Sequence, residues 1–445
     1  MKRKYLNTLI AVVFLAGLWG GITYFDKRAS RKASETGAPK EEKIFSLDSK
    51  HITAITFHPS DGESVACQHE GDTWAITEPR KLSADQGALS TVLNNLTTAT
   101  VEQVVNQNPS DLKEFGLNPP AYSVEVSTDS NPPKFTLLLG EDTPTGNEVY
   151  AQVAGNPRVI TLASYLKSNL EKKLIDVRDR HALTLDADQL QRIEAESKGK
   201  KWTLAKNPDG VWDLVLPPSA RADRFAVDGL ISQLRSLTMQ SIPAEDKKNL
   251  AAYGFGAPGL RLRLTGPGGT QTLVLGKKDT EGDRYFAMNS ATEPVFTLNS
   301  TFLNEFQKDP ADLRSKDLFS FSSGSANHVE IDSPKGHSVF ESQNNQWKQT
   351  EGGTKVPAAG KMDNLLTRLQ SLRASTFPKG SDLAQIGLTK PAYRFTVRSG
   401  EKNQTETLEV SKKGDHVYAR LSTDPLACEI SKSEFDELEK ALGDL

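Results

Sequence analysis

The 445-residue sequence contains few of the residues that usually reveal a reaction. Its two cysteines, Cys67 and Cys428, lie far apart and form no CxxC motif, so neither a disulfide framework nor a cysteine metal site is indicated. We expect two small buried hydrophobic side chains instead. The seven histidines include no HxH or HExxH pair, and no GxSxG nucleophile elbow or P-loop occurs. The sequence therefore nominates no catalytic residue, metal ligand or cofactor.

Excess basic charge is also missing. Lysine and arginine number 54 against 57 aspartates and glutamates, a formal net charge of -3, whereas nucleic-acid binding usually needs a concentrated basic surface. We expect no nucleic-acid partner. The acidic pairs Glu141 with Asp142 and Glu281 with Asp283 follow strand ends, which favours solvated turns. Calcium binding there is the minor alternative.

One long hydrophobic run stands at the N-terminus. Residues 6–25 contain no charged side chain, and a helix of that length spans the ~30 Å of a bilayer's hydrocarbon core. Aromatic residues gather at its far end and no Ala-x-Ala site follows, which favours an uncleaved transmembrane anchor over a removed signal peptide. The lipid bilayer is thus an expected partner.

Orientation follows less directly, because basic residues flank the run on both sides. A tail of a few residues before the run is typical of an export signal. We therefore predict a single-pass inner-membrane protein, with residues 1–25 forming the cytoplasmic tail and anchor and the bulk of the chain periplasmic or extracytoplasmic. Residues 26–43 are polar and predict a flexible stalk.

The rest of the sequence repeats three times. Tryptophans near strand starts, Trp74, Trp212 and Trp347, precede at nearly constant spacing the glycines Gly116, Gly254 and Gly387. Between each pair lies an apolar i, i+3, i+4, i+7 pattern, which predicts one amphipathic helix per repeat. Alternating runs that predict strands follow each glycine. A tyrosine then recurs in "EVYAQV", "DRYFAM" and "HVYARL", as Tyr150, Tyr285 and Tyr418.

The repeat length indicates tandem domains. A period of about 135 residues is the size of an independent domain and exceeds that of solenoid repeats. We predict α+β domains with mainly antiparallel sheets, and call residues 44–181, 182–318 and 319–445 the first, second and third repeats. Asp85 and Asp223 stand where a helix start favours an acidic side chain.

Each of these glycines lies in a related phrase: "DLKEFGLNPP", "NLAAYGFGAP" and "DLAQIGLTKP". A glycine after a short helical turn matches a helix end with positive φ, and the following proline prevents the helix from continuing. We therefore predict a stop-and-turn that sends the chain into the sheet. A backbone nest for an anion is the weaker alternative, because no glycine-rich continuation follows.

These features resemble the bacterial domain-of-unknown-function family 4340 over roughly residues 44–443. The resemblance rests on the tryptophan strand, the helix, the glycine phrase, the "LxLG" to "YA" run, and an Asp-x-Arg that ends at Arg178 and Arg314. It implies one transmembrane segment before tandem domains, association with gliding-type ABC export systems, and no catalytic residues. The third repeat departs from it, with "LEVS" for "LLLG" and no Asp-x-Arg.

Arg178 and Arg314 fall where one repeat passes to the next. Each is expected either to pair with a carboxylate or cap a helix and fix the angle between repeats, or to be a solvated surface side chain. Two classes of function stay open. The first is a non-enzymatic, membrane-tethered scaffold or binding protein, an accessory of an ABC-type envelope system; the second is a ligand-binding receptor or hydrolase with a site between adjacent repeats.

Overall fold

A computed structural model describes residues 42–445 except 132, 217–218, 345, 355, 379–381, 423 and 425. The predicted anchor at residues 6–25 and nearly all of the stalk lie outside the described residues. No helix within the described part is long and apolar enough to span a membrane. The chain divides into two compact units, with the boundary in the sequence between Arg180 and His181.

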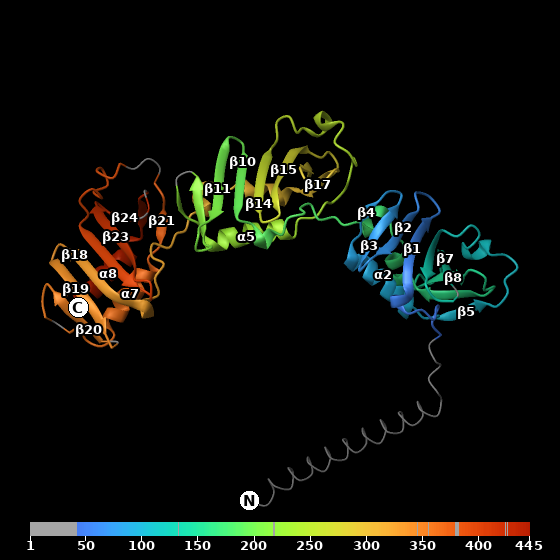
Figure 1. The fold of residues 1–445 in the computed structure, drawn as a ribbon, viewed down its shortest axis with the longest axis horizontal. Coiled ribbons are helices and arrows are strands. Elements are labelled where there is room, and N and C mark those ends of the chain that lie inside the picture. Colours follow the sequence, from blue (N-terminus) through green and yellow to red (C-terminus); the bar gives the residue numbers. More distant parts are fainter. Residues whose placement is uncertain are drawn as a thin grey trace, which may run out of the picture. The chain divides into compact units, whose positions relative to one another are not determined.

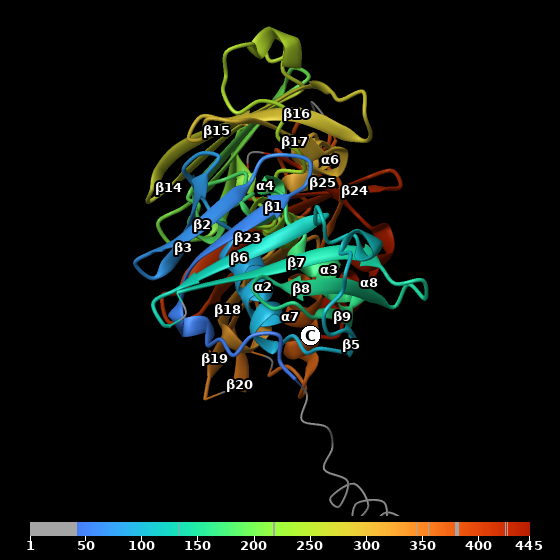
Figure 2. The same ribbon diagram turned by 90° about the vertical axis from the view of Figure 1, so that its right-hand side faces the viewer.

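The first unit contains a nine-stranded sheet in which every pairing is antiparallel, in the order β4-β3-β2-β1-β6-β7-β8-β9-β5 (Figure 1). Figures 1 and 2 show α2 against one face of this sheet, where it also contacts α3. The elements are η1 Ser49–His51, β1 Ile52–Pro59, β2 Val65–Glu70, β3 Thr73–Glu78, β4 Leu82–Ser83, α2 Gln86–Thr98, β5 Gln103–Asn106, η2 Lys113–Phe115, β6 Tyr122–Thr128, β7 Lys134–Asp142, β8 Glu148–Val153, β9 Val159–Ala163, α3 Ser164–Leu170 and α4 Leu174–Val177.

The second unit contains two eight-stranded antiparallel sheets. The sheet of the second repeat has the order β13-β12-β11-β10-β14-β15-β16-β17. Its elements are η3 Ala187–Gln189, β10 Arg192–Ser197, β11 Lys200–Lys206, β12 Trp212–Leu216, β13 Ala220–Arg221, α5 Arg224–Arg235, η4 Leu250–Tyr253, β14 Leu260–Gly266, β15 Gly269–Lys278, β16 Arg284–Asn289, β17 Val295–Asn299, α6 Ser300–Phe306 and η5 Pro310–Leu313.

The sheet of the third repeat has the order β20-β19-β18-β22-β23-β24-β25-β21. Its elements are η6 Ser323–Ser325, β18 Ala326–Ser333, β19 Gly336–Gln343, β20 Gln346–Glu351, α7 Lys361–Ser371, β21 Ala374–Thr376, β22 Tyr393–Ser399, β23 Gln404–Lys413, β24 His416–Leu421, β25 Cys428–Ile430 and α8 Lys432–Gly443. The prediction of an α+β chain with mainly antiparallel sheets is confirmed. The three predicted domains correspond to three sheets, although the second and third repeats form one compact unit.

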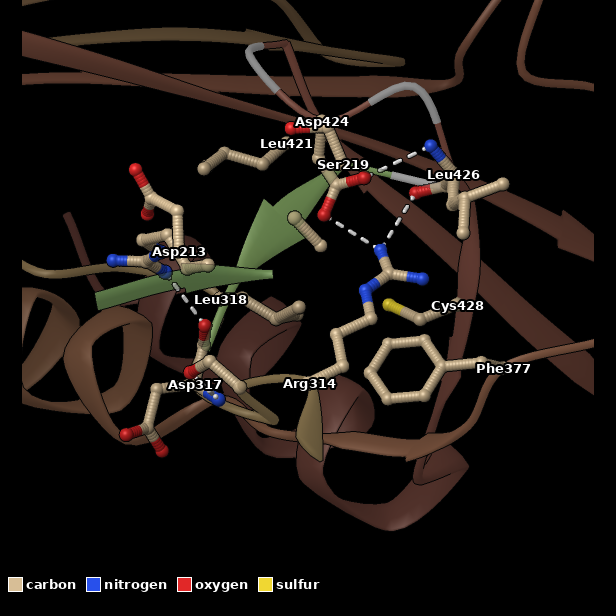
Figure 3. Close-up of a pocket in the computed structure, with 13 residues that line it drawn as sticks. Asp213, Ser219, Arg314, Asp317, Leu318, Phe377, Leu421, Asp424, Leu426 and Cys428 are labelled. Atoms are coloured by element: carbon tan, nitrogen blue, oxygen red, sulfur yellow. Dashed lines mark hydrogen bonds and ion pairs between the residues drawn. The ribbon is translucent and has the colours of Figure 1, made fainter. Parts of the chain in front are cut away.

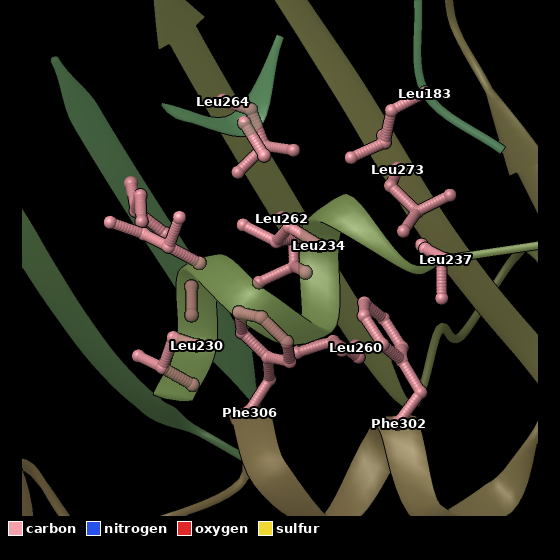
Figure 4. Close-up of a cluster of buried hydrophobic side chains, with 14 of the residues drawn as sticks. Leu183, Leu230, Leu234, Leu237, Leu260, Leu262, Leu264, Leu273, Phe302 and Phe306 are labelled. Atoms are coloured by element: carbon pink, nitrogen blue, oxygen red, sulfur yellow. The ribbon is translucent and has the colours of Figure 1, made fainter. Parts of the chain in front are cut away.

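Each sheet has its own hydrophobic core on the helix-covered face. In the second repeat, Leu230 and Leu234 of α5 pack against leucines of β14 and phenylalanines of α6 (Figure 4). Burying one such side chain contributes about 1.5–3 kcal/mol. All positions of the predicted helical pattern are buried: Leu89, Val92, Leu93 and Leu96 in α2, Val227, Leu230, Ile231 and Leu234 in α5, and Met362, Leu365, Leu366 and Leu369 in α7.

Helix starts differ between the repeats. Asp85 and Asp223 are N-caps, and each side chain accepts a hydrogen bond of 2.9 Å from a backbone N–H in the first turn. These contacts satisfy donors that the helix itself leaves unpaired. In the third repeat the N-cap is Gly360, with φ 78° and no side-chain cap, so α7 starts without this stabilisation.

The three glycine phrases are stop-and-turn elements, as predicted. Gly116, Gly254 and Gly387 have φ of 65°, 79° and 80°, and the first two end the 3-10 helices η2 and η4. Their N–H groups donate to carbonyls three residues back, at 3.0, 3.3 and 3.2 Å. These N–H groups are used within the turn, so the anion-nest alternative has no support.

The phrases cover the face of the sheet opposite the helices. In the second repeat, Phe255 packs with Val274 and Val295 in a small cluster separate from the main core. Val274 alternates along β15 with the core residues Leu273 and Leu275, so its side chain points to the other face. The glycine phrase therefore turns a two-layer domain into a local three-layer one.

The phrase reaches the sheet through a second glycine. A Cβ on Gly140 would lie 2.1 Å from the carbonyl oxygen of Phe115, and one on Gly276 would lie 2.1 Å from that of Tyr253. Only a residue without a side chain fits there, because real Cβ contacts are never that short. This explains the glycine of "LLLG" and "LVLG". In "LEVS", the Ser411 hydroxyl instead donates a hydrogen bond to the equivalent carbonyl, that of Ile386.

One predicted landmark is wrong by one position. The fully buried alanines that follow in β8, β16 and β24 align Tyr150 and Tyr418 with Phe286, and not with Tyr285. Phe286 packs on Tyr253 at 5.0 Å between ring centroids, as Tyr150 packs on Phe115 at 5.1 Å. Tyr285 faces the main core. The sequence pattern points to the tyrosine because a strand tolerates aromatic residues on both faces.

The three landmark tryptophans lie on equivalent strands. Trp74 is on β3, Trp212 on β12 and Trp347 on β20, each the third strand of its sheet in chain order. All three pack against their cores, Trp74 as a buried side chain and the other two as partly buried ones. They are structural landmarks of the first half of each sheet.

Candidate site between the second and third repeats

The chain passes from the second to the third repeat in an extended segment that is bonded on both sides. Backbone bonds of 2.8 Å link Asp223 N–H to the Leu313 carbonyl and Ser315 N–H to the Arg221 carbonyl, which adds the segment to the edge of β13. Two residues later, Asp317 bridges to Arg373 of the third repeat. This segment is therefore no free linker.

Arg314, the arginine of the second Asp-x-Arg, projects from this segment into the third repeat (Figure 3). Its side chain is only 6% exposed. Nη2 donates to Asp424 Oδ2 at 2.6 Å and to the Leu426 carbonyl at 3.2 Å. The guanidinium carbon lies 3.9 Å from the ring centroid of Phe377. An ion pair, a backbone contact and a cation–π contact thus hold one side chain.

A cavity of about 270 Å³ lies beside this contact. Both repeats line it, with Asp213, Ser219, Arg221 and Asp317 from the second and Leu421 and Asp424 from the third (Figure 3). A ligand-binding receptor or hydrolase, the second class of function, would have its site between adjacent repeats, where this cavity lies. The cavity lining mixes charged and apolar side chains. Its chemistry depends on whether the charged groups are available.

Most charged groups around the cavity already have partners. Arg221 Nη2 donates to the Asp317 carbonyl at 2.7 Å, and Nη1 lies 3.7 Å from Glu406 Oε1. The Asp317 carboxylate lies 3.0 Å from Arg373 Nε. The contacts with Glu406 and Arg373 join the two repeats to each other, so the polar side chains around the cavity help to hold the repeats together.

Neither cysteine offers a nucleophile. Cys428 lines the cavity, but its thiol is buried and contacts the Ala419 carbonyl at 3.4 Å. Burial raises the pKa of Cys428 to about 12 and likewise raises the pKa of Cys67 to about 12. At neutral pH both thiols stay protonated, and the thiol is a poor nucleophile. The prediction of two buried free cysteines is confirmed.

Within the described residues, one cluster has the ligand types for a metal ion: Glu330, Asp332 and His337 on the β18–β19 hairpin. His337 Nδ1 lies 2.7 Å from Asp332 Oδ1 and 4.0 Å from Glu330 Oε1, while Arg394 Nη1 lies 3.8 Å from Asp332 Oδ2. The Asp332 hydrogen bond, followed by the nearby carboxylates, raises the pKa of His337 above its ordinary value. The geometry is that of an exposed ion-pair network with a neighbouring cation.

The predicted acidic pairs lie beside lysines. Asp142 Oδ1 is 2.9 Å from Lys167 Nζ, and Asp283 Oδ1 is 2.8 Å from Lys278 Nζ. Each pair therefore has a cation at the position where a calcium site would need further oxygen ligands. The lysine contacts leave the calcium alternative without support. Asp283 lies in the turn after β15 as predicted, whereas Glu141 and Asp142 are the last two residues of β7.

Arg178 lies close to the end of the first unit, in the same local structure as Arg314. Asp85 N–H donates to the Val177 carbonyl and Asp179 N–H to the Ser83 carbonyl, both at 2.8 Å. Arg178 is 5% exposed. The alternative of a solvated arginine therefore describes neither Arg178 nor Arg314.

Sequence reasoning found Arg314 but missed its partners. Asp424 lies in the β24–β25 loop, and the register of β16 and β24 places Thr292 at that position in the second repeat. Phe377 follows β21, in a segment that carries no repeated motif. Because the residue at the acceptor position of Arg314 differs between repeats, the repeated residues alone could not identify this contact.

Comparison with known proteins gives one result. A family model described as a domain of unknown function, DUF4340, matches residues 74–214 and again 212–391. Both matches begin at a landmark tryptophan strand, so each runs from the middle of one repeat into the next. No curated protein and no solved structure matches the chain.

Proposed function

We propose, from the premise that this chain belongs to the DUF4340 family, that it is a non-enzymatic, membrane-tethered extracytoplasmic scaffold or binding protein. Its partner would be the membrane part of an ABC-type envelope transport system, as the resemblance of the repeats implies. The tether would be residues 6–25, whose length and lack of charge suit a bilayer.

The contacts of Arg314 between the second and third repeats carry this proposal. Charged side chains that converge on a cavity can serve a ligand or hold the protein together. Here the guanidinium of Arg314 is bonded to Asp424 and Leu426, and Arg221 forms an ion pair with Glu406 across the same boundary. Groups committed to such contacts fix the angle between repeats, which a scaffold requires.

The other repeated residues support the same conclusion. The glycines serve a tight turn and a close backbone approach, and the tryptophans serve the cores. An enzyme usually has a perturbed acid, base or nucleophile in its cleft. At this cavity the group with a strongly shifted pKa is the Cys428 thiol, and the shift makes it less reactive.

A receptor with its site between repeats is the second candidate, because the cavity of about 270 Å³ lies where that alternative places it. It is close to the lower limit of ordinary small-molecule pockets, about 300 Å³. A ligand would have to bind without breaking the Arg314–Asp424 pair. Ligand addition would then raise the melting temperature of the unit formed by residues 181–445.

The test uses the full chain in bacterial membranes. We expect retention after high-salt and carbonate washing, because a spanning helix is not held by charge, and co-purification of an ABC transporter's membrane subunit after chemical cross-linking. The control deletes residues 6–25. Release of the intact chain by carbonate, or equal cross-linking of the deletion variant, would contradict the tethered scaffold.

A further inference from the structure

The third repeat contains a second cavity, of about 260 Å³, between its first β-hairpin and the end of α8. Ile331 and Phe340 of the hairpin, Leu442 in the last turn of α8 and Leu445 after the helix form its apolar walls. The cavity lies inside one repeat and is separate from the contacts of Arg314 between repeats. Its origin becomes clear when the three repeats are compared.

The first two repeats fill this place with apolar side chains. Across the first hairpin, Val65 faces Phe57 in the first repeat and Trp202 faces Ala195 in the second. Both Val65 and Trp202 are 2% exposed, and the Trp202 indole stacks on Phe306 of the closing helix α6. In the third repeat the residue in this register is Ser338, which faces Ile331. An isoleucine–serine pair is the smallest of the three.

The neighbouring strand shows a second substitution of the same kind. Ile76 and Leu214 occupy equivalent core positions and are 0% and 2% exposed. The third repeat has Gln349 there, opposite Phe340. Gln349 Nε2 donates to Ser338 Oγ at 3.2 Å. Two polar groups therefore replace two core side chains and bond to each other at the cavity wall.

This pattern differs from ordinary core variation. A smaller core residue is usually compensated by a larger neighbour, as Ala195 is by Trp202, because an unfilled cavity destabilises the fold. Here both positions change to smaller or polar side chains and the space remains. No concentration of polar residues in one repeat is visible in the sequence, because Ser338 and Gln349 become neighbours only across a strand pair.

We propose that this cavity binds a small aromatic molecule with one carboxylate group. A cavity of about 150 Å³ holds benzene and drug-sized pockets start near 300 Å³, so this volume suits one or two rings. The Trp202 indole shows which shape the same place accepts in the second repeat. Ser338 and Gln349 give hydrogen bonds to the polar end.

Lys335 supplies the charge for that end. It lines the cavity on the exposed hairpin turn, and its Nζ lies 3.7 Å from where a Cβ on Gly443 would stand. The ammonium therefore sits at the edge between the turn and the end of α8. A carboxylate at the mouth would accept a charge-assisted hydrogen bond from it.

The test measures binding of indole-3-carboxylate to the full chain in mild detergent by ligand-observed NMR titration, with neutral indole and acetate as matched probes. We expect saturable binding of indole-3-carboxylate and none of acetate. Lys335→Ala should weaken indole-3-carboxylate about tenfold, the effect of one charge-assisted contact, and leave indole unchanged. This inference does not rest on the tethered-scaffold function, because the assay needs no partner.

The decisive variant is Ser338→Trp, which copies the second repeat and fills the cavity. It should weaken indole-3-carboxylate at least tenfold, and it also controls for partition of the probe into detergent. If thiol labelling of Cys428 shows that this variant is unfolded, Ser338→Leu is the smaller filler, with the same expected loss. No saturation at millimolar probe, or equal binding by a folded filler variant, would overturn the proposal.

Discussion

The Ser411 hydroxyl donates a hydrogen bond to the carbonyl oxygen of Ile386 in the third repeat, where the first two repeats have a glycine. In those repeats the same carbonyl, from Phe115 or Tyr253, lies where a side chain at Gly140 or Gly276 would have to be. Both arrangements let the glycine phrase pack closely on the sheet, by the absence of a side chain in the first two repeats and by a hydrogen bond in the third.

Exchanging these residues should be costly in both directions. Ser411→Gly leaves the buried Ile386 carbonyl without its side-chain partner, which should cost about 1–3 kcal/mol of unfolding free energy in the third repeat. Gly276→Ser should destabilise the second repeat more, because its Cβ would meet the Tyr253 carbonyl oxygen at 2.1 Å. Calorimetry of the full chain checks both; an unchanged melting profile for Gly276→Ser would contradict the close approach.

The turn glycines give a graded prediction. Gly254→Val places a β-branched residue at φ 79°, which costs about 1–3 kcal/mol from strain alone. The new Cβ would also lie 2.8 Å from the backbone nitrogen of Lys277, whereas the atom nearest to a Cβ on Gly387 is 3.4 Å away. Gly387→Val is therefore the matched control and should lower its transition less. Equal effects of the two variants in calorimetry would contradict a steric contribution.

The cysteines should report unfolding of separate repeats. Because burial raises both thiol pKa values to about 12, Cys67 and Cys428 should resist a thiol reagent at pH 8 in the native protein. Adding urea should expose Cys67 when the first repeat unfolds and Cys428 when the third does. Mass spectrometry of labelled peptides measures each site, and rapid labelling of Cys428 without urea would show that it is accessible.

The His337 ion pair should make stability depend on pH. Its pKa is raised in the folded chain, chiefly by the Asp332 hydrogen bond, so the stabilisation is fully present below about pH 6.5, the unfolded pKa. It is lost as pH rises through the higher folded pKa. We expect NMR titration to give a lower His337 pKa in Asp332→Asn than in the wild type. The same pKa in both would contradict the assignment of its cause.

Much of the fold could be predicted from the sequence because the repeats record it three times. The apolar spacing of α2, α5 and α7 marks the helices, and positive φ follows from glycine at Gly116, Gly254 and Gly387. What could not be predicted depends on contacts distant in sequence. The partners of Gly140 and Ser411 are backbone carbonyls, which no side-chain pattern records.

The site was harder to predict for the same reason. Arg314 stood out because Arg178 repeats it, but Asp424 lies 110 positions later in a loop where the repeats differ. The cavity beside Ser338 arises where the third repeat differs from the other two. Residues shared by the repeats therefore do not reveal it. The Tyr285 error has the opposite cause, since identical letters were aligned where the strand register places Phe286.

A double-mutant cycle of Arg314→Met with Asp424→Asn measures whether the Arg314–Asp424 contact fixes the third repeat to the second. Denaturant unfolding of the full chain, followed through the unit of residues 181–445, gives the coupling free energy. We expect a coupling of about 1–3 kcal/mol between these side chains, as for residues in one buried contact. Effects that add within about 0.5 kcal/mol would show that the pair does not hold the repeats together.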